Sequence, residues 1–419
     1  MTRSRKKSIW VIVIHFLLDQ MGYAIVIPLL PLMFGVASSP FYLLDKNTAA
    51  YGMGLMGLFV SAYPLAQFLA APVIGQYADR IGRRRMLIFS TFGTVISYLI
   101  LIAGILMGNV WVVIAARFFD GITGGNVSVA QTVLADVSLP KERSKNFGLV
   151  MAMAGVGIVL GPTLGGFLAT DNFIHVSGPL VAFILILLFY VFDVLLLWVF
   201  LTETLEKKST EKVNWWGAFT MFTKRHDLRG VKGLLTARFL YSFGSNVFTN
   251  FIGAYLIARF AMSAGTIGNF YSLVGLGIIL TQAIVVRVLA KKFSEEKIFS
   301  NSLLATAVIV MLFLLPNADK VIYLLVFPMA LTFGLVDANL LAVISNRVKK
   351  EQQGSVMGMA TSLKALAQTV SPIVAGVIAA GFGLSMDIFL ASILMFVTWV
   401  LFWKIGKSSS FVSPPLSPS

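Results

Sequence analysis

The stretch "GQYADRIGRRR", residues 75–85, decides the fold. It carries five charged side chains, and it lies between two runs, 52–74 and 86–107, that carry none. A helix needs about 20 consecutive apolar residues to cross a bilayer, so each run is long enough to span one. The charged stretch is then a short connection at a membrane surface. It predicts a chain of membrane-spanning helices.

Composition extends this prediction to the whole chain. Hydrophobic residues make up 58% of it, charged residues 12%, and the mean hydropathy is +0.87, whereas soluble domains carry about 25% charged residues. The chain has no cysteine, which excludes disulfides and thiolate metal sites, and we expect no metal and no other cofactor. No phosphate-binding loop and no nucleophile–base arrangement stands out, so we expect neither an ATP-driven pump nor an enzyme.

Twelve spanning segments can be marked, which predicts an all-α membrane protein. They are 9–36, 52–74, 86–107, 110–137, 144–169, 178–201, 232–259, 265–289, 297–315, 320–346, 353–380 and 384–405. Basic stretches such as "PKERSK" (140–145) and "NRVKKEQ" (346–352) follow the even-numbered segments. The connections after the odd-numbered segments hold almost no basic residue beyond Lys46, Arg259 and Lys320.

This alternation predicts an orientation. Lys and Arg gather on the cytoplasmic loops of membrane proteins, so we expect both termini and all the basic connections in the cytoplasm, and the chain in the plasma (inner) membrane. The formal net charge of +15 then reflects topology, and nucleic acid is not an expected partner. The expected partners are the lipid bilayer, protons and a small-molecule substrate, and we expect a monomer.

The chain divides into two related halves. Pro162 and Gly166 match Pro372 and Gly376, which lie 210 residues further on. Two parallel six-helix repeats place a central cavity between them, near the bilayer midplane. We therefore expect an N-terminal six-helix repeat over 1–201, a cytoplasmic linker over 202–231, a C-terminal six-helix repeat over 232–405 and a disordered cytoplasmic tail over 406–419.

The opening stretch carries the pattern Gly-x-x-x-Asp-Arg-x-Gly-Arg-Arg. Its residues are Gly75, Asp79, Arg80, Gly82, Arg83 and Arg84. Gly75 is expected to allow close helix contact, Gly82 a tight turn, and Asp79 a bond to a helix N-terminus or a basic residue. Plain positive-inside charge is the alternative interpretation. The full pattern at this junction resembles the signature of the major facilitator superfamily, which implies the major facilitator fold.

The fifth segment contains "GVGIVLGPTLGG", residues 155–166. Gly157, Gly161 and Gly165 form one smooth stripe for close helix packing, and Pro162 favours a kink. Ordinary small-residue packing would explain the stripe. However, the Gly-Pro-x-x-Gly-Gly ending, through Gly166, resembles the antiporter motif of the superfamily's drug/proton exporters, which implies export.

The first segment contains "LLDQMGYAIVIPLLP", residues 17–31, with Asp19 inside the span. An ionisable group near the bilayer centre costs roughly 2.5–3.5 kcal/mol on insertion scales, so it needs a role or a partner. The stretch resembles the first-helix motif of the tetracycline/proton antiporters, and the resemblance continues through 116–136. Those exporters carry a carboxylate in the third helix where this chain has Ser97. They lack a counterpart of Asp120, so the resemblance does not predict tetracycline itself as cargo.

Polar residues form stripes on the segments expected at the cavity, and on the fourth segment the spacing of Arg117, Asp120 and Gln131 predicts that they share one helical face. For proton coupling we single out Asp19, Asp120 and Arg117, because the resemblance links this arginine to coupling. Asp120 either replaces the carboxylate missing at Ser97 as a proton site or only neutralises Arg117 within one helical turn. For the substrate cavity the candidates are Tyr23, Gln131, Arg238, Asn246, Asn250, Asp337, Lys364 and Gln368. The alternative is that such groups only bond one another across helices, at about 0.6 kcal/mol each.

Together with these residues, the resemblance implies a proton-coupled exporter of an amphipathic compound or drug, and only its fifth-segment motif favours export over import. A carboxylate that moves between dry and wet surroundings, or toward and away from Arg117, changes its proton affinity, and this would couple protonation to conformation. His15 is a weaker relay candidate, and Asp193 and Arg259 are expected to be structural or snorkelling residues. Two alternatives stay open: the same fold with a siderophore, lipid-like metabolite or nutrient as cargo, including import, and a non-transporting membrane receptor.

Overall fold

The computed structural model describes residues 3–39, 41–139, 142–169, 178–205, 209–210, 231–348 and 350–407. Most of the predicted linker 202–231 and of the predicted tail 406–419 lies outside these ranges. Within them the regular structure is helical and no strand occurs. The prediction of an all-α fold is therefore confirmed, and nine helices of the described part are long and apolar enough to cross a membrane.

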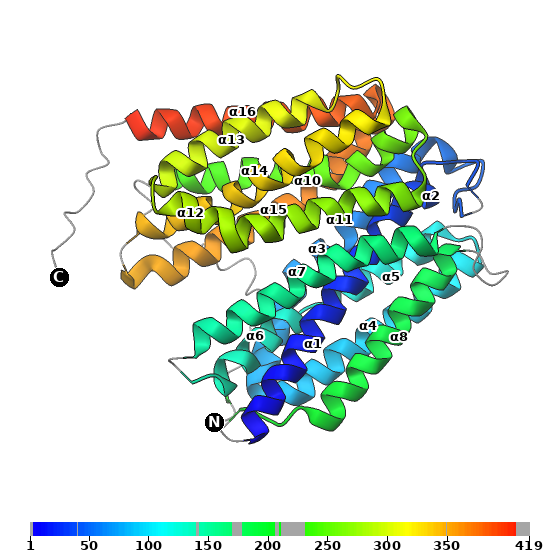
Figure 1. Cartoon of the computed structure of the whole chain (residues 1–419). Helices are drawn as coiled ribbons and strands as arrows, with labels where there is room; N and C mark the ends of the chain where they lie inside the picture. Colours follow the sequence, from blue (N-terminus) through cyan, green and yellow to red (C-terminus); the bar gives the residue numbers. More distant parts are fainter. Residues whose placement is uncertain are drawn as a thin grey trace.

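Helices from the first half of the chain form one group, low in Figure 1. They are α1 (Arg3–Ile25), the 3-10 turn η1 (Ile27–Leu29), α2 (Leu30–Phe34), α3 (Gly52–Ile81), α4 (Arg83–Leu106), α5 (Val110–Thr123), α6 (Asn126–Val137), α7 (Arg143–Leu168) and α8 (Gly178–Phe200). Pro28 and Pro31 stand at the starts of η1 and α2, where proline fits the first turn of a helix. The first predicted span thus ends in two short turns.

Helices from the second half form the other group, at the top of Figure 1. They are α10 (Lys232–Phe260), α11 (Ala264–Leu280), a π-helical turn (Thr281–Val285), α12 (Val286–Ala290), α13 (Glu295–Leu312), α14 (Asp319–Asn346), α15 (Lys350–Phe382) and α16 (Leu384–Lys407). Helix α1 begins and α16 ends at the same end of the molecule, and α2 lies at the other end (Figure 1). We call the latter the α2 end.

The two halves meet along two matching seams. At one seam the Pro162 carbonyl of α7 lies so close to Gly268 of α11 that a β-carbon there would overlap it, and a β-carbon on Gly166 would lie 2.6 Å from the Ala264 carbonyl oxygen. At the other, α15 meets α3 in the same way. There the Pro372 carbonyl lies against Gly57, and a β-carbon on Gly376 would lie 2.5 Å from the Met53 carbonyl oxygen.

Both seams lie toward the α2 end of the helices. Gly57 and Gly268 lie within the first two turns of α3 and α11, and Gly166 and Gly376 lie within the last two turns of α7 and α15. Only glycine allows backbones to approach this closely. The predicted repeat is therefore visible as two related contacts that hold the halves together at one end.

The predicted fourth span, 110–137, is wrong as a single helix. It is two helices, α5 and α6, separated by Gly124 and Gly125. The Gln67 side chain donates a 2.6 Å bond to the Gly124 carbonyl oxygen, which the break exposes. A β-carbon on Gly124 would lie 2.6 Å from the Tyr63 hydroxyl, so glycine is needed where the chain passes α3. The break makes Asn126 the first residue of a new helix.

The opening stretch, 75–85, forms the end of α3 and the start of α4. Gly82 has a φ of +113°, which side chains disfavour, in agreement with the predicted tight turn. Arg83 binds Asp136 of α6 and lies 3.5 Å from Asp79. Glu203, which follows α8, accepts a 3.0 Å bond from the Arg83 backbone N–H at the start of α4.

One expectation for this stretch is wrong in the observed conformation. A β-carbon on Gly75 would meet nothing within 4 Å, so this glycine permits no close helix contact here. Arg84 donates a 2.5 Å bond to the Trp198 carbonyl oxygen of α8, and Arg80 is exposed. Apart from the bond to Glu203, which lies in the predicted linker, these contacts stay within the first half.

Candidate functional site

A cavity of about 420 Å³ lies between the two halves. Its lining joins α1, α3, α4, α5, α6, α7 and α8 with α10 and α15. The structure brings together eight residues singled out from the sequence: Asp19, Tyr23, Arg117, Asp120, Asn246, Asn250, Lys364 and Gln368. On α3 and α15 the lining residues follow the seams directly on the side away from the α2 end, so the seams close the cavity there.

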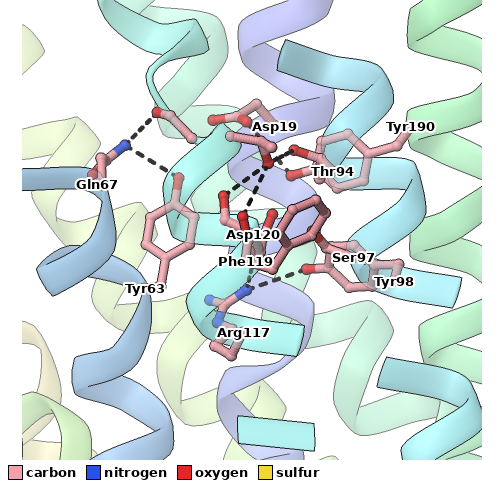
Figure 2. A network of polar contacts seen from close by, with 12 residues as sticks. Asp19, Tyr63, Gln67, Thr94, Ser97, Tyr98, Arg117, Phe119, Asp120 and Tyr190 are labelled. Carbon is pink, nitrogen blue, oxygen red and sulfur yellow. Dashed lines mark hydrogen bonds and ion pairs between the residues drawn. The ribbon is translucent and has the colours of Figure 1, made fainter. Parts of the chain in front are cut away.

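Arg117 and Asp120 form an ion pair on one turn of α5 (Figure 2). Arg117 Nη1 lies 2.8 Å from Asp120 Oδ2, and the residues are 6% and 4% exposed. The guanidinium also donates to the Tyr98 hydroxyl at 3.4 Å and lies over the Tyr63 ring, 4.8 Å from its centroid. A ring face stabilises a cation in such a desolvated position, so the charge is held by one carboxylate and surrounding tyrosines.

Asp19 lies on α1 at the same wall of the cavity. Its carboxylate accepts bonds from Asn126 at 3.3 Å, from Gln20 at 3.1 Å and from the Tyr190 hydroxyl at 3.5 Å. Asn126 opens α6, and a helix N-terminus favours a nearby negative charge. The unpredicted break in the fourth span therefore gives Asp19 two sources of stabilisation while leaving it without a basic partner among these bonds.

A second ion cluster adjoins the cavity in the other half. Arg238 of α10 lies 2.5 Å from Asp337 of α14, and Lys364 of α15 approaches the same carboxylate at 3.8 Å. Two cations thus share one anion. Because Arg238 is buried and Lys364 lines the cavity, the surplus positive charge faces the cavity at Lys364.

Three residues predicted for the substrate cavity, Gln131, Arg238 and Asp337, are not among its lining residues. Gln131 is exposed on α6 and lies outside the cavity lining, because the break at Gly124 ends the face it was expected to share with Arg117. Arg238 and Asp337 are not lining residues, and they reach the cavity only through Lys364. Of the two expectations for Asp193, structural or snorkelling, the structure excludes the second, because the residue is fully buried and lies 2.6 Å from His15.

The glycines of the predicted antiporter motif on α7 serve close helix packing. A β-carbon on Gly157, Gly161 or Gly165 would overlap α1, at distances as short as 2.7 Å from the Leu17 carbonyl oxygen for Gly157. The stripe therefore joins α7 to α1 within the first half, while Gly166 belongs to the seam. Ser97 donates to the Gly93 carbonyl oxygen of its own helix, at 2.9 Å, and is not among the residues that line the cavity.

Several cavity residues were missed from the sequence. Tyr63, Tyr98 and Tyr190 surround the charged wall, and Gln67 holds the break in the fourth span. Tyrosine gathers at membrane interfaces, so its occurrence in the middle of three apolar spans was a signal that could have identified them. Asn126 carried no such signal, because its role depends on a helix break that periodicity does not show.

Comparison with known proteins agrees with this architecture. A sequence profile of the Major Facilitator Superfamily matches residues 12–231 and 234–418. The tetracycline resistance protein, class D, of Salmonella ordonez is 29% identical over 364 residues, which cover 85% of this chain and 86% of that protein. Major facilitator superfamily domain-containing protein 10 of Mus musculus is 26% identical over 446 residues, covering 96% and 93%.

A solved structure is also similar over nearly the full length. The crystal structure of the human organic anion transporter MFSD10 (TETRAN) superposes with a TM-score of 0.68 at 25% identity, covering 96% of this chain and all of that one. Two groups of helices around a cavity, matching seams and the profile match over both halves lead to one conclusion. The chain belongs to the Major Facilitator Superfamily.

Proposed function

We propose that the protein exports a small amphipathic compound in exchange for protons, by alternating access, in the plasma (inner) membrane. The observation that carries this proposal is the cavity between the halves. One wall holds Asp19 and the Arg117–Asp120 pair, and the other holds amides and Lys364. Cargo and protons would therefore use the same space, which is what exchange requires.

Asp19 is the proposed proton carrier. It is 6% exposed, lines the cavity and has hydrogen-bond donors but no ion-pair partner at hydrogen-bond distance among the contacts described above. A carboxylate of this kind gains or loses a proton when its access to water changes. Asp120 is the second proposed site, because any movement that pulls Arg117 away leaves this carboxylate unpaired.

Alternating access would use the two seams. In the observed conformation they hold the halves together at the α2 end. If the termini are cytoplasmic, as the basic connections predict, this conformation opens to the cytoplasm, where an exporter loads its cargo and releases its proton. Opening to the other side would require both seams to separate. It would also bring residues 75–85 of the first half into contact with the second half.

The chemistry of the lining supports an amphipathic cargo. Tyr23, Tyr63 and Ile158 offer aromatic and apolar contact, while Asn246, Asn250 and Gln368 offer amides. Pockets of this size and composition bind drug-sized molecules through apolar area and are oriented by a few polar groups. The antiporter motif at Pro162 and the similarity to a tetracycline resistance protein favour export.

Everted membrane vesicles that enclose a pH-sensitive dye test this function. After the lumen is acidified, tetracycline, ethidium and fluorescein are added one at a time. We expect at least one compound to drive proton efflux in the wild type, and the effect to be lost in Asp19→Asn. Asp45→Asn, an exposed carboxylate near the α2 end, is the matched control. Proton efflux that persists at wild-type rate in both Asp19→Asn and Asp120→Asn refutes the proposal.

A second candidate differs in the charge of the cargo. Lys364 brings surplus positive charge to the cavity, and the human relative of known structure is titled an organic anion transporter. An organic anion would place its acidic group at Lys364. Fluorescein-driven efflux that is reduced tenfold or more in Lys364→Gln, but unchanged in the distant Lys320→Gln, would favour this cargo over a neutral or cationic one.

A further inference from the structure

A second titratable pair lies in the first half, outside the cavity lining. His15 of α1 and Asp193 of α8 approach to 2.6 Å between Nδ1 and Oδ2, and their side chains are 1% and 0% exposed. Breaking a buried ion pair is costly, and an apolar pair of similar volume would serve packing equally well. Packing alone therefore does not account for these two residues.

Each partner keeps one polar atom without a bond. His15 Nε2 and Asp193 Oδ1 are buried and have no hydrogen-bond partner among the residues that the structure describes. Buried polar atoms are normally bonded, and an exception calls for an explanation. Since Nδ1 is engaged by the carboxylate, Nε2 is the nitrogen at which a proton can be added or removed.

Asp19 connects this pair to the cavity. It follows His15 by four residues, so the two side chains are neighbours on one face of α1, with about 5–6 Å between their β-carbons. Tyr190, three residues before Asp193 on α8, donates to Asp19 at 3.5 Å. The charged groups that face His15 are thus Asp193 from α8 and Asp19 from its own helix, and α7 presents Gly157 and Gly161 to α1.

We propose that His15 and Asp193 form a second proton-binding site whose occupancy depends on the charge of Asp19. With Asp19 ionised, two carboxylates hold the proton on the imidazole. With Asp19 neutral, only Asp193 does, and the imidazole gives up its proton more readily. The only bond that forms or breaks is N–H at Nε2, and cavity water reached through Asp19 supplies or accepts the proton.

The site extends the proposed proton coupling, but it can be tested without cargo or transport, so the two proposals can fail separately. The chain has three histidines, His15, His175 and His226. In the double variant His175→Gln/His226→Gln, His15 is the one remaining histidine. This full-length protein, labelled with ¹⁵N-histidine and placed in lipid nanodiscs, gives a nitrogen spectrum of one imidazole between pH 5 and 9.

We expect the Nε2 signal to move from its protonated to its neutral position within this range. Asp19→Asn should shift the midpoint by about one pH unit or more toward acid, since one nearby charge of opposite sign changes proton affinity by roughly this amount. Asp387→Asn, a buried carboxylate on α16 in the other half, should leave the midpoint in place. Asp193→Glu, which preserves the carboxylate, should retain the titration if Asp193→Asn does not fold.

A signal that keeps one protonation state across the whole range would show that His15 is only structural. An unchanged midpoint in Asp19→Asn would show that the two sites are independent. Either result overturns the proposal, even if drug-driven proton efflux is found. Conversely, the titration and its shift would support the site even if no compound drove efflux.

Discussion

Arg117 and Asp120 bind each other across one turn of α5, with 2.8 Å between Nη1 and Oδ2, in a place where each charge alone would be costly. We expect Asp120→Asn to destabilise the protein by about 2–4 kcal/mol, because it leaves the guanidinium buried without its counter-charge. Thermal unfolding of the purified protein in detergent measures this loss.

The double variant Arg117→Gln/Asp120→Asn is the control for that prediction. Removing both charges should restore part of the stability, so the double variant is more stable than the sum of the two single changes implies. If the losses of stability in the two single variants simply add in the double variant, Arg117 and Asp120 are not energetically coupled. The ion pair would then contribute nothing to stability.

The seams predict a conformational effect. Gly268→Leu places a side chain against the Pro162 carbonyl, so the halves cannot close at the α2 end. Lys46, on the connection after α2, and Lys320, in the first turn of α14, are exposed and belong to opposite halves. Spin labels at these two positions should report a longer distance in this variant. Gly148→Leu is the matched control, because a β-carbon there meets nothing within 4 Å. Equal distance distributions in the two variants would contradict the closing role of the seam.

Glu203 should stabilise the start of α4. Its carboxylate accepts the Arg83 backbone N–H at 3.0 Å and satisfies a donor that the helix leaves open. We expect Glu203→Ala to cost about 1 kcal/mol, as the loss of a helix cap usually does. Chemical denaturation measures the loss, and the exposed Lys46→Gln should show none.

Asn126 should tune the pH dependence of transport. It donates to Asp19 at 3.3 Å and thereby favours the charged carboxylate. Asn126→Ala should raise the pH of half-maximal proton-driven transport by about half a unit, because protonation of Asp19 becomes easier. Asn250→Ala, in the other half of the cavity, should change the KM for cargo and leave the pH profile in place. An identical profile in wild type and Asn126→Ala would refute the link.

The fold was predictable because its determinants are local in sequence. Apolar runs of bilayer length and the basic connections between them specify the spans, and the match of Pro162 with Pro372 specifies the repeat. Cavity residues on regular helices, such as Asn246 and Lys364, also follow from spacing. Each of these inferences requires only the periodicity of a regular helix and the knowledge of which helices are neighbours.

The rest depends on contacts between distant segments. The break between α5 and α6 is held by Gln67 of α3, and Asp193 is buried because His15 lies opposite it. A single sequence shows neither pairing, so for Asp193, near a helix end, the sequence left a structural and a snorkelling side chain as equal alternatives. The fourth span was therefore predicted as one helix, and Gln131 was placed on a face that does not exist.

The two seams have a further consequence. Each half contributes a glycine from an early turn and a proline–glycine pair from a late turn. The two halves therefore contact each other through equivalent surfaces. This is the geometry of an isologous dimer, in which a patch is complementary to itself. A six-helix unit with this one patch would already form both contacts with a second copy. Fusing two copies then frees each seam to diverge, so that the opening of one can be tuned without altering the other.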